Sequence, residues 1–137
     1  MSYSSLFIDR RTVVADDLDE LEHVNNLQYL RWSLKAAGAH SKQVGWPSDR
    51  YRKLGAGWIV RSHSITYKVS AVLNDEILIR TWIADFERMS STRKYEIVRA
   101  SDNRVCALAE TRWVFVDFTT RKLTEIPEEI RTAFAKR

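Results

Sequence analysis

The spacing of hydrophobic and polar positions changes twice along this chain of 137 residues. Residues 6–15 alternate moderately, which predicts a first strand. Residues 25–38 carry apolar side chains at spacings of three and four, which predicts a helix with one core-facing side, ended by Gly38. The predicted apolar stripe consists of Val24, Leu27, Leu30, Leu34 and Ala37.

From residue 58 onward the pattern is typical of strands, because β-branched and aromatic residues become frequent. The predicted strands are residues 58–69, 76–87, 92–100 and 104–118. Between the last two, Ser-Asp-Asn at residues 101–103 predicts a hairpin turn.

Two further segments complete the predicted order of elements. Residues 40–56 contain several glycines and a proline, which predicts a long loop with one short helical turn. Pro127, with two glutamates behind it, predicts the first position of a short C-terminal helix whose last residues are Lys136 and Arg137. One strand, one long helix and four strands predict an α+β fold with the helix packed on an antiparallel sheet. The length predicts a single domain, residues 1–137.

Composition narrows the class of protein. A content of 45% hydrophobic and 29% charged residues is typical of a globular protein. The single Cys106 cannot form an internal disulfide and favours a reducing compartment, and its alternating segment predicts a packed thiol. We expect no secretory signal and no membrane span, because neither a long apolar run nor a basic leader pattern occurs, and we expect a cytoplasmic location.

The net charge of +4 does not indicate a nucleic-acid partner. Lysines and arginines are scattered among acids rather than clustered, and no zinc-finger or glycine-rich pattern accompanies them. Cysteines and histidines occur nowhere at metal-ligand spacing, so we expect no metal and no cofactor.

The strongest candidate chemistry lies just before the predicted helix. Asp19 and His23 are four residues apart, and Asn25 with Gln28 forms a capping-box pattern at the helix start. A helix N-terminus favours developing negative charge, so this arrangement suits attack on a carbonyl group. The alternative interpretation is purely structural, with the Asp and Asn residues as caps and the histidine making one hydrogen bond.

Residues 17–29 have the pattern Asp-x-Asp-x-x-x-His-Val-Asn-Asn-x-x-Tyr. This pattern resembles the signature of the hotdog-fold acyl-CoA thioesterases, the 4-hydroxybenzoyl-CoA thioesterase-like group. Residues 60–76 are similar to that family's central strand and the turn after it, and residues 113–117 and 126–130 resemble its last strand and closing segment. One departure is Glu22, where the family commonly has glycine, and it bears on the backbone of the loop.

The resemblance implies a hotdog fold, with the sheet wrapped around the central helix, and hydrolysis of an acyl thioester. It implies Asp19 as the catalytic carboxylate, either a general base toward water or a nucleophile. It implies the backbone N–H of Asn26 as oxyanion donor. His23 is expected to orient the loop or contact the acyl carbonyl region, and Asn25 to cap the helix beside the substrate.

The resemblance also suggests residues that contact the substrate. Residues 86–90 resemble a strand-end segment whose basic residues meet coenzyme A phosphates, which makes Arg88 and Ser90 candidates, with a plain surface arginine and turn serine as the alternative. Three aromatic residues either line an acyl pocket or pack in the core, namely Tyr29, Trp32 and Trp58. Neither His40 nor His63 has a partner identifiable in the sequence, and His63 is expected to be structural.

Competing functions remain open at this stage. One is a hotdog hydratase or dehydratase, although those enzymes use an acid and a histidine at another spacing. The other is a non-catalytic acyl- or CoA-binding module. The expected partners are an acyl-CoA, or an acyl carrier protein thioester, and further copies of the chain. A homodimer or homotetramer is expected because a single sheet would leave long edges unpaired.

Overall fold

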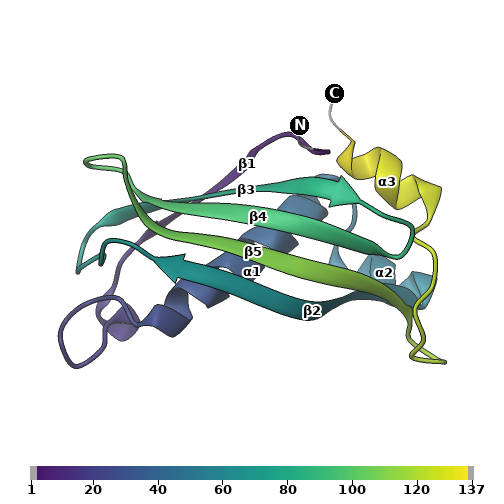
Figure 1. Cartoon of the computed structure of the whole chain (residues 1–137), viewed down its shortest axis with the longest axis horizontal. Coiled ribbons are helices and arrows are strands. Elements are labelled where there is room, and N and C mark those ends of the chain that lie inside the picture. The colour runs from purple at the N-terminus through teal and green to yellow at the C-terminus, as the bar shows by residue number, and fades with distance from the viewer. Residues whose placement is uncertain (1–2, 136–137) are drawn as a thin grey trace.

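A computed structural model describes residues 3–135, which form one antiparallel sheet with a long helix across one face (Figure 1). The strands are β1 (Phe7–Thr12), β2 (Ala56–Tyr67), β3 (Glu76–Phe86), β4 (Ser90–Arg99) and β5 (Arg104–Asp117). The helices are α1 (Asn26–Gln43), α2 (Ser48–Leu54) and α3 (Glu128–Phe134), with a short 3₁₀ turn at Ala15–Asp17. The strand order is β1-β3-β4-β5-β2, so β1 and β2 are the edge strands. The predicted α+β architecture is therefore confirmed.

The two ends of the chain differ in detail from the prediction. The first strand covers only Phe7–Thr12, because the backbone N–H of Val13 turns to the carbonyl of Asp75 and the chain then enters the 3₁₀ turn. Pro127 is the N-cap of α3 rather than its first helical residue. Lys136 and Arg137 lie outside the described residues. Within residues 3–135, no helix is both long and apolar enough to cross a membrane.

Helix α1 is longer than predicted, since it continues through Gly38 to Gln43. Glycine inside a helix costs about 1 kcal/mol relative to alanine, and burial of the following turn against the sheet outweighs this cost. Consequently the predicted loop at residues 40–56 is mostly helical, with the end of α1 and all of α2 inside it. Gly55 ends α2 in the left-handed conformation, with φ of 80°.

The buried face of α1 is rotated from the predicted stripe. Leu27 is 57% exposed, and Leu30 and Leu34 are only half-buried, so the leucines follow the border of the helix contact instead of its centre. Aromatic and small side chains occupy the centre, where small residues allow close approach to the sheet. The buried positions of α1 are Tyr29, Trp32, Ser33, Ala36, Ala37 and His40.

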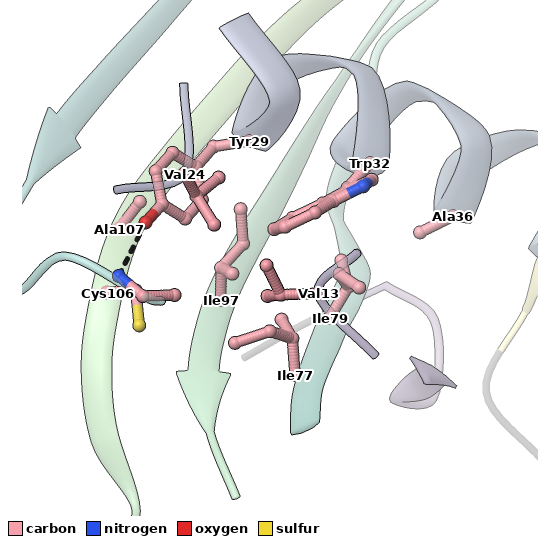
Figure 2. Close-up of a cluster of buried hydrophobic side chains, with 11 residues drawn as sticks. Val13, Val24, Tyr29, Trp32, Ala36, Ile77, Ile79, Ile97, Cys106 and Ala107 are labelled. Carbon is pink, nitrogen blue, oxygen red and sulfur yellow. Dashed lines mark hydrogen bonds between the residues drawn. The ribbon is translucent and has the colours of Figure 1, made fainter. Parts of the chain in front are cut away.

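The hydrophobic core consists of two clusters, and α1 contributes buried side chains to the first. The first, drawn in Figure 2, packs Tyr29 and Trp32 of α1 on isoleucines of β3 and β4. Cys106 is fully buried in this cluster, as the sequence predicted. The second cluster lies toward α2 and α3 and includes Phe115 and Phe134.

A polar layer separates the two clusters. Along β3, Ile79 belongs to the first cluster and Ile83 to the second, and the buried Thr81 lies between them. The Nη1 of Arg93 on β4 donates to Thr81 Oγ1 at 3.1 Å and to Nδ1 of His40 on α1 at 3.0 Å. Burial, and secondly the nearby Arg93 charge, lower the pKa of His40 to about 4, so its ring is neutral at pH 7.

The stability of the fold should therefore decrease as the pH falls from 6.5 to 4. In this window the unfolded chain binds a proton at His40 that the folded chain does not, so unfolding becomes easier, by roughly 3 kcal/mol in total. Urea unfolding of wild type and of His40→Gln at pH 7.5 and 4.5 measures this loss in the free energy of unfolding. The variant should lose less stability on acidification, and an equal loss in both proteins would contradict the prediction. His23→Gln is the control, because the His23 ring is exposed and makes no hydrogen bond to residues 3–135.

Candidate active site

The segment before α1 folds back on itself as a tight antiparallel loop. Leu18 and Val24 form an isolated β-bridge, and the N–H of Asp19 donates to the carbonyl of His23 at 2.8 Å. At the turn, Glu22 adopts a φ of 62°, in the left-handed region that favours glycine. The loop thus keeps the backbone conformation that glycine would favour, although a glutamate occupies the position.

The two carboxylate oxygens of Asp19 have different surroundings. Its Oδ1 accepts hydrogen bonds from the backbone N–H groups of Leu21 at 2.9 Å and His23 at 3.2 Å. Its Oδ2 accepts none from residues 3–135, and the side chain is exposed. The carboxylate is therefore oriented by the loop through one oxygen while the other stays accessible.

Asp17, the other acid of the motif, has a structural role. It is 8% exposed; its Oδ2 accepts from the N–H of Val14, and its Oδ1 accepts from Gln28 Nε2 at 2.6 Å. The predicted capping box is therefore wrong in one half, because Gln28 reaches Asp17 instead of the N–H of Asn25. The other half is confirmed, since Asn25 Oδ1 accepts from the N–H of Leu27 at 2.9 Å as the N-cap of α1.

Asn26 is the first residue of α1, so its backbone N–H has no acceptor within the helix. Its carbonyl accepts a hydrogen bond from the hydroxyl of Tyr67 at the end of β2. The ring of His23 is exposed and makes no hydrogen bond to the described part of the chain. Over the same residues, no group of three or more histidines, cysteines and acids is placed to hold a metal ion.

The acid loop is held against the segment between β2 and β3. Val24 donates its N–H to the carbonyl of Ala71, His23 forms an isolated bridge with Val72, and the Tyr29 hydroxyl accepts from the N–H of Ala71 at 3.0 Å. Tyr29 is 2% exposed. The structure therefore gives Tyr29 a supporting position, away from the cavity described below.

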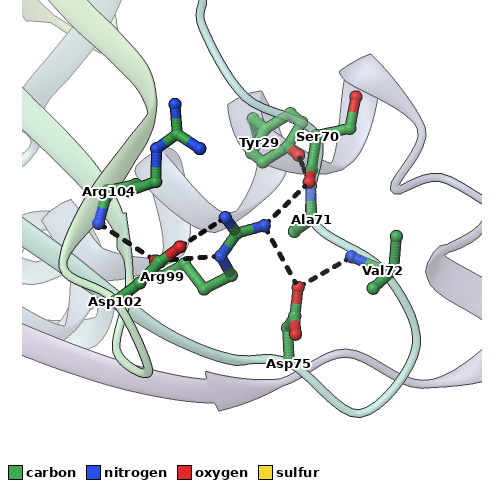
Figure 3. A network of polar contacts seen from close by, with 8 residues as sticks. All are labelled: Tyr29, Ser70, Ala71, Val72, Asp75, Arg99, Asp102 and Arg104. Carbon is green, nitrogen blue, oxygen red and sulfur yellow. Dashed lines mark hydrogen bonds and ion pairs between the residues drawn. The ribbon is translucent and has the colours of Figure 1, made fainter.

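A network of charges fixes that supporting segment from the other side (Figure 3). Arg99 donates to the carbonyl of Ser70 and lies 3.9 Å from Asp75, which in turn accepts from the N–H of Val72. Two further bonds from Arg99 reach Asp102 at 3.0 and 2.6 Å and lower the pKa of that carboxyl to about 2. The position of Asp19 thus depends on residues that are remote in sequence.

A cavity of about 160 Å³ lies under the C-terminal half of α1. The sheet, α1, α2 and the end of α3 enclose it. Trp58 of β2 lines it and donates to the hydroxyl of Tyr51 at 3.1 Å, and its predicted contact with an acyl group stays a prediction. Trp32 packs in the first core cluster instead. Other lining residues are Leu34, Gly38, Trp46, Arg93, Trp113 and Phe134.

Arg88 lies in the turn between β3 and β4, and Ser90 is the first residue of β4. The loop that carries Asp19 lies toward the opposite end of the sheet, beside the segment that leads into β3 (Figure 1). Arg88 is exposed and 3.8 Å from Glu125, and Ser90 Oγ accepts from Arg112 at 3.0 Å. A role for either residue in binding phosphate stays a prediction.

Sequence reasoning missed the pair formed by His40 and Arg93. Two features could have indicated this pair. Arg93 lies on a strand between inward-facing positions, and His40 lies on the buried side of a helix. His63, expected to be structural, does have a partner, since its Nδ1 lies 3.0 Å from Thr111 Oγ1.

The topology and the position of the acid loop define a class of protein. One antiparallel sheet packed on a single long helix, with a carboxylate loop at the start of that helix, is a hotdog fold. Residues 13–134 match the family model of the thioesterase-like superfamily, and the chain belongs to that superfamily.

Individual relatives agree with this assignment. The chain is 27% identical, over 97% of its length, to oleoyl-acyl carrier protein thioesterase 2 of Arabidopsis thaliana, of which it spans 37%. It is 26% identical, over 73% of its length, to oleoyl-acyl carrier protein thioesterase of Coriandrum sativum, of which it spans 29%. The chain thus covers well under half of these curated relatives.

Solved structures show the same fold. The 1,4-dihydroxy-2-naphthoyl-CoA thioesterase of Synechocystis superposes with a TM-score of 0.88 at 22% identity, over 95% of this chain and 96% of that one. A Staphylococcus aureus protein crystallised in complex with CoA superposes with a TM-score of 0.89 at 16% identity, over 97% and 84% of the two chains.

The left-handed conformation at Glu22 should make this position a site of strain. Glu22→Gly should be more stable than Glu22→Ala by about 1 kcal/mol, because only glycine adopts positive φ without a Cβ clash. Chemical unfolding of both variants measures the difference. At Glu20, whose φ is not positive, glycine should be the less stable of the two substitutions. If Glu22→Gly proved less stable than Glu22→Ala, the inferred conformation would be contradicted.

Proposed function

We propose that this chain hydrolyses an acyl thioester of coenzyme A or of acyl carrier protein. The observation that carries the proposal is the loop before α1, which holds Asp19 by one oxygen and leaves the other accessible. The N–H of Asn26, which has no acceptor within the helix, begins α1 directly after this loop. Membership of the thioesterase-like superfamily supports the same activity, and the names of relatives support both carriers.

Two routes to hydrolysis are compatible with the geometry. In the first, Asp19 removes a proton from water, the hydroxide adds to the thioester carbonyl, and the C–S bond breaks to release a thiol and a free acid. In the second, Asp19 itself displaces the thiolate to form a mixed anhydride, which water then hydrolyses to regenerate the carboxylate. In both, the N–H of Asn26 stabilises the oxyanion, a contribution of about 10²–10³ in rate for such a donor. His23 would contact the acyl carbonyl region.

We also propose that the complete site is shared between two copies of the chain. Asp19 precedes the start of α1, whereas Leu34, the first residue of α1 in the cavity wall, lies eight residues into the helix, about 12 Å along its axis. A short acyl group cannot span that distance within one chain. A second copy can supply the missing half.

The free edge of β2 is the surface that would join the two copies. It is twelve residues long, and unpaired edges of this length recruit a further strand. Because Tyr67 at the end of β2 bonds to Asn26 at the start of α1, the strand and helix run in opposite directions. Antiparallel pairing of two β2 edges about a two-fold axis would therefore bring Asp19 of one protomer toward the cavity of its partner.

Asp19→Asn should lower kcat by about 10² or more on the best acyl-CoA, because it keeps the side-chain shape and removes the base or nucleophile. Thiol release from a panel of acyl-CoAs measures the activity, and thermal melts establish that the variant is folded. Asp16→Asn is the matched control, since Asp16 is a neighbouring exposed acid. A folded Asp19→Asn protein that keeps more than about a tenth of the wild-type kcat would favour a binding module instead.

Mixing two inactive variants tests the shared site. Asp19→Asn lacks the carboxylate, and Gly38→Trp fills the cavity, so each homodimer should be inactive. A statistical mixture refolded together should regain about a quarter of wild-type activity, since half the dimers would carry one intact site. Light scattering should give at least twice the 16.0 kDa mass of the chain. A monodisperse monomer, or no recovery on mixing, would contradict the shared site.

A further inference from the structure

Arg93 places a fixed positive charge in the wall of the cavity. Its side chain is on the inner face of β4, only 4% of the residue is exposed, and it lines the cavity together with aromatic side chains. Burial lowers its pKa to about 10, so the guanidinium remains charged at pH 7. A buried charge is costly unless an opposite charge compensates it.

No opposite charge compensates Arg93 among residues 3–135. Its only hydrogen bonds there are those from Nη1 to Thr81 and His40, which are both neutral. No carboxylate of that part of the chain lies within 4.0 Å of the guanidinium, and the ring of Phe134, 5.9 Å away, offers only the weaker attraction of an aromatic face. Nε and Nη2 make no hydrogen bond to the described part of the chain. The cavity wall thus contains a cation with donors to spare.

Gly38 lies at the open rim of the cavity. The residue is exposed, and a Cβ built there would meet no atom within 4 Å. A side chain at this position would therefore meet no backbone clash on its way into the cavity.

We propose that the cavity binds the far end of an acyl group that carries a second carboxylate. A carboxylate accepts two parallel hydrogen bonds from a guanidinium and supplies the missing negative charge. The volume of about 160 Å³ resembles the engineered apolar cavity of about 150 Å³ that holds one benzene molecule. The part of the occupant held inside the cavity is therefore a short chain of about six non-hydrogen atoms that ends in carboxylate.

This inference rests on the proposed thioester hydrolysis for the identity of the attached group. Arg93 would act on selection between substrates and not on the reacting bond. Its loss should therefore lower kcat/KM for acidic acyl groups much more than for neutral ones, which changes the ratio between them.

The test compares glutaryl-CoA and adipyl-CoA with pentanoyl-CoA and hexanoyl-CoA. Wild type should prefer the acidic member of each pair by at least about tenfold in kcat/KM, and Arg93→Met should abolish that preference. Arg93→Lys keeps the charge without the paired donors and should show an intermediate ratio; it carries the test if the Met variant does not fold. Lys94→Met is the matched control, because Lys94 is the next residue of β4, exposed on the other face and paired with Glu110.

A binding measurement separates failure of this inference from failure of the proposed activity. Three tryptophans line the cavity, so titration with free glutarate and with uncharged pentanamide can be followed by intrinsic fluorescence. Wild type should bind glutarate more tightly than pentanamide, and Arg93→Met should not. Saturable glutarate binding without turnover of any thioester would refute the proposed hydrolysis and support the carboxylate site. Turnover with equal preference for acidic and neutral substrates in wild type and Arg93→Met would refute the carboxylate site alone.

Discussion

The packing of α1 on the inner face of the sheet is the constraint on which the rest of the structure depends. At its N-terminal end, Tyr29 inserts between the sheet and the segment before β3, and its hydroxyl accepts the N–H of Ala71. The carbonyl of Ala71 accepts from Val24, so the acid loop and the helix start are fixed to one backbone unit. Movement of the helix would therefore move Asp19 and the N–H of Asn26 together. Their relative position is set by packing rather than by the flexible loop alone.

The same helix explains why the core is divided. A continuous apolar stripe would have joined both clusters, but His40 on α1 and Arg93 on β4 meet in the middle. Desolvating an arginine without a counter-charge works against stability, and replacement of buried charges by apolar residues is often stabilising. Because this charge costs stability and lines the cavity, the proposed binding of a carboxylate would give it a role that folding does not.

The sequence predicted the order of elements, because strand and helix periodicities follow directly from which faces are buried. It did not predict the end of α1, since a glycine that breaks an isolated helix is tolerated when the next turn packs on a sheet. Nor did it predict that the leucines lie at the border of the helix contact, because the hydrophobic pattern cannot distinguish large apolar side chains from the small and aromatic ones that approach closest. Asp19 was predictable from its motif, whereas Arg93 and His40 meet only through tertiary contacts between residues 53 positions apart.

The length of the acyl group decides whether one chain could hold it beside both Asp19 and the cavity. An acyl group of six or seven atoms spans about 8 Å at roughly 1.2 Å per bond, less than the axial separation of about 12 Å between the start of α1 and Leu34. If Asp19 and the cavity serve one short substrate, they must come from different protomers. A long acyl chain would not impose this requirement, since it could follow the helix within a single chain. In the proposed reaction, a short acyl group therefore requires the second copy that would pair with the free edge of β2.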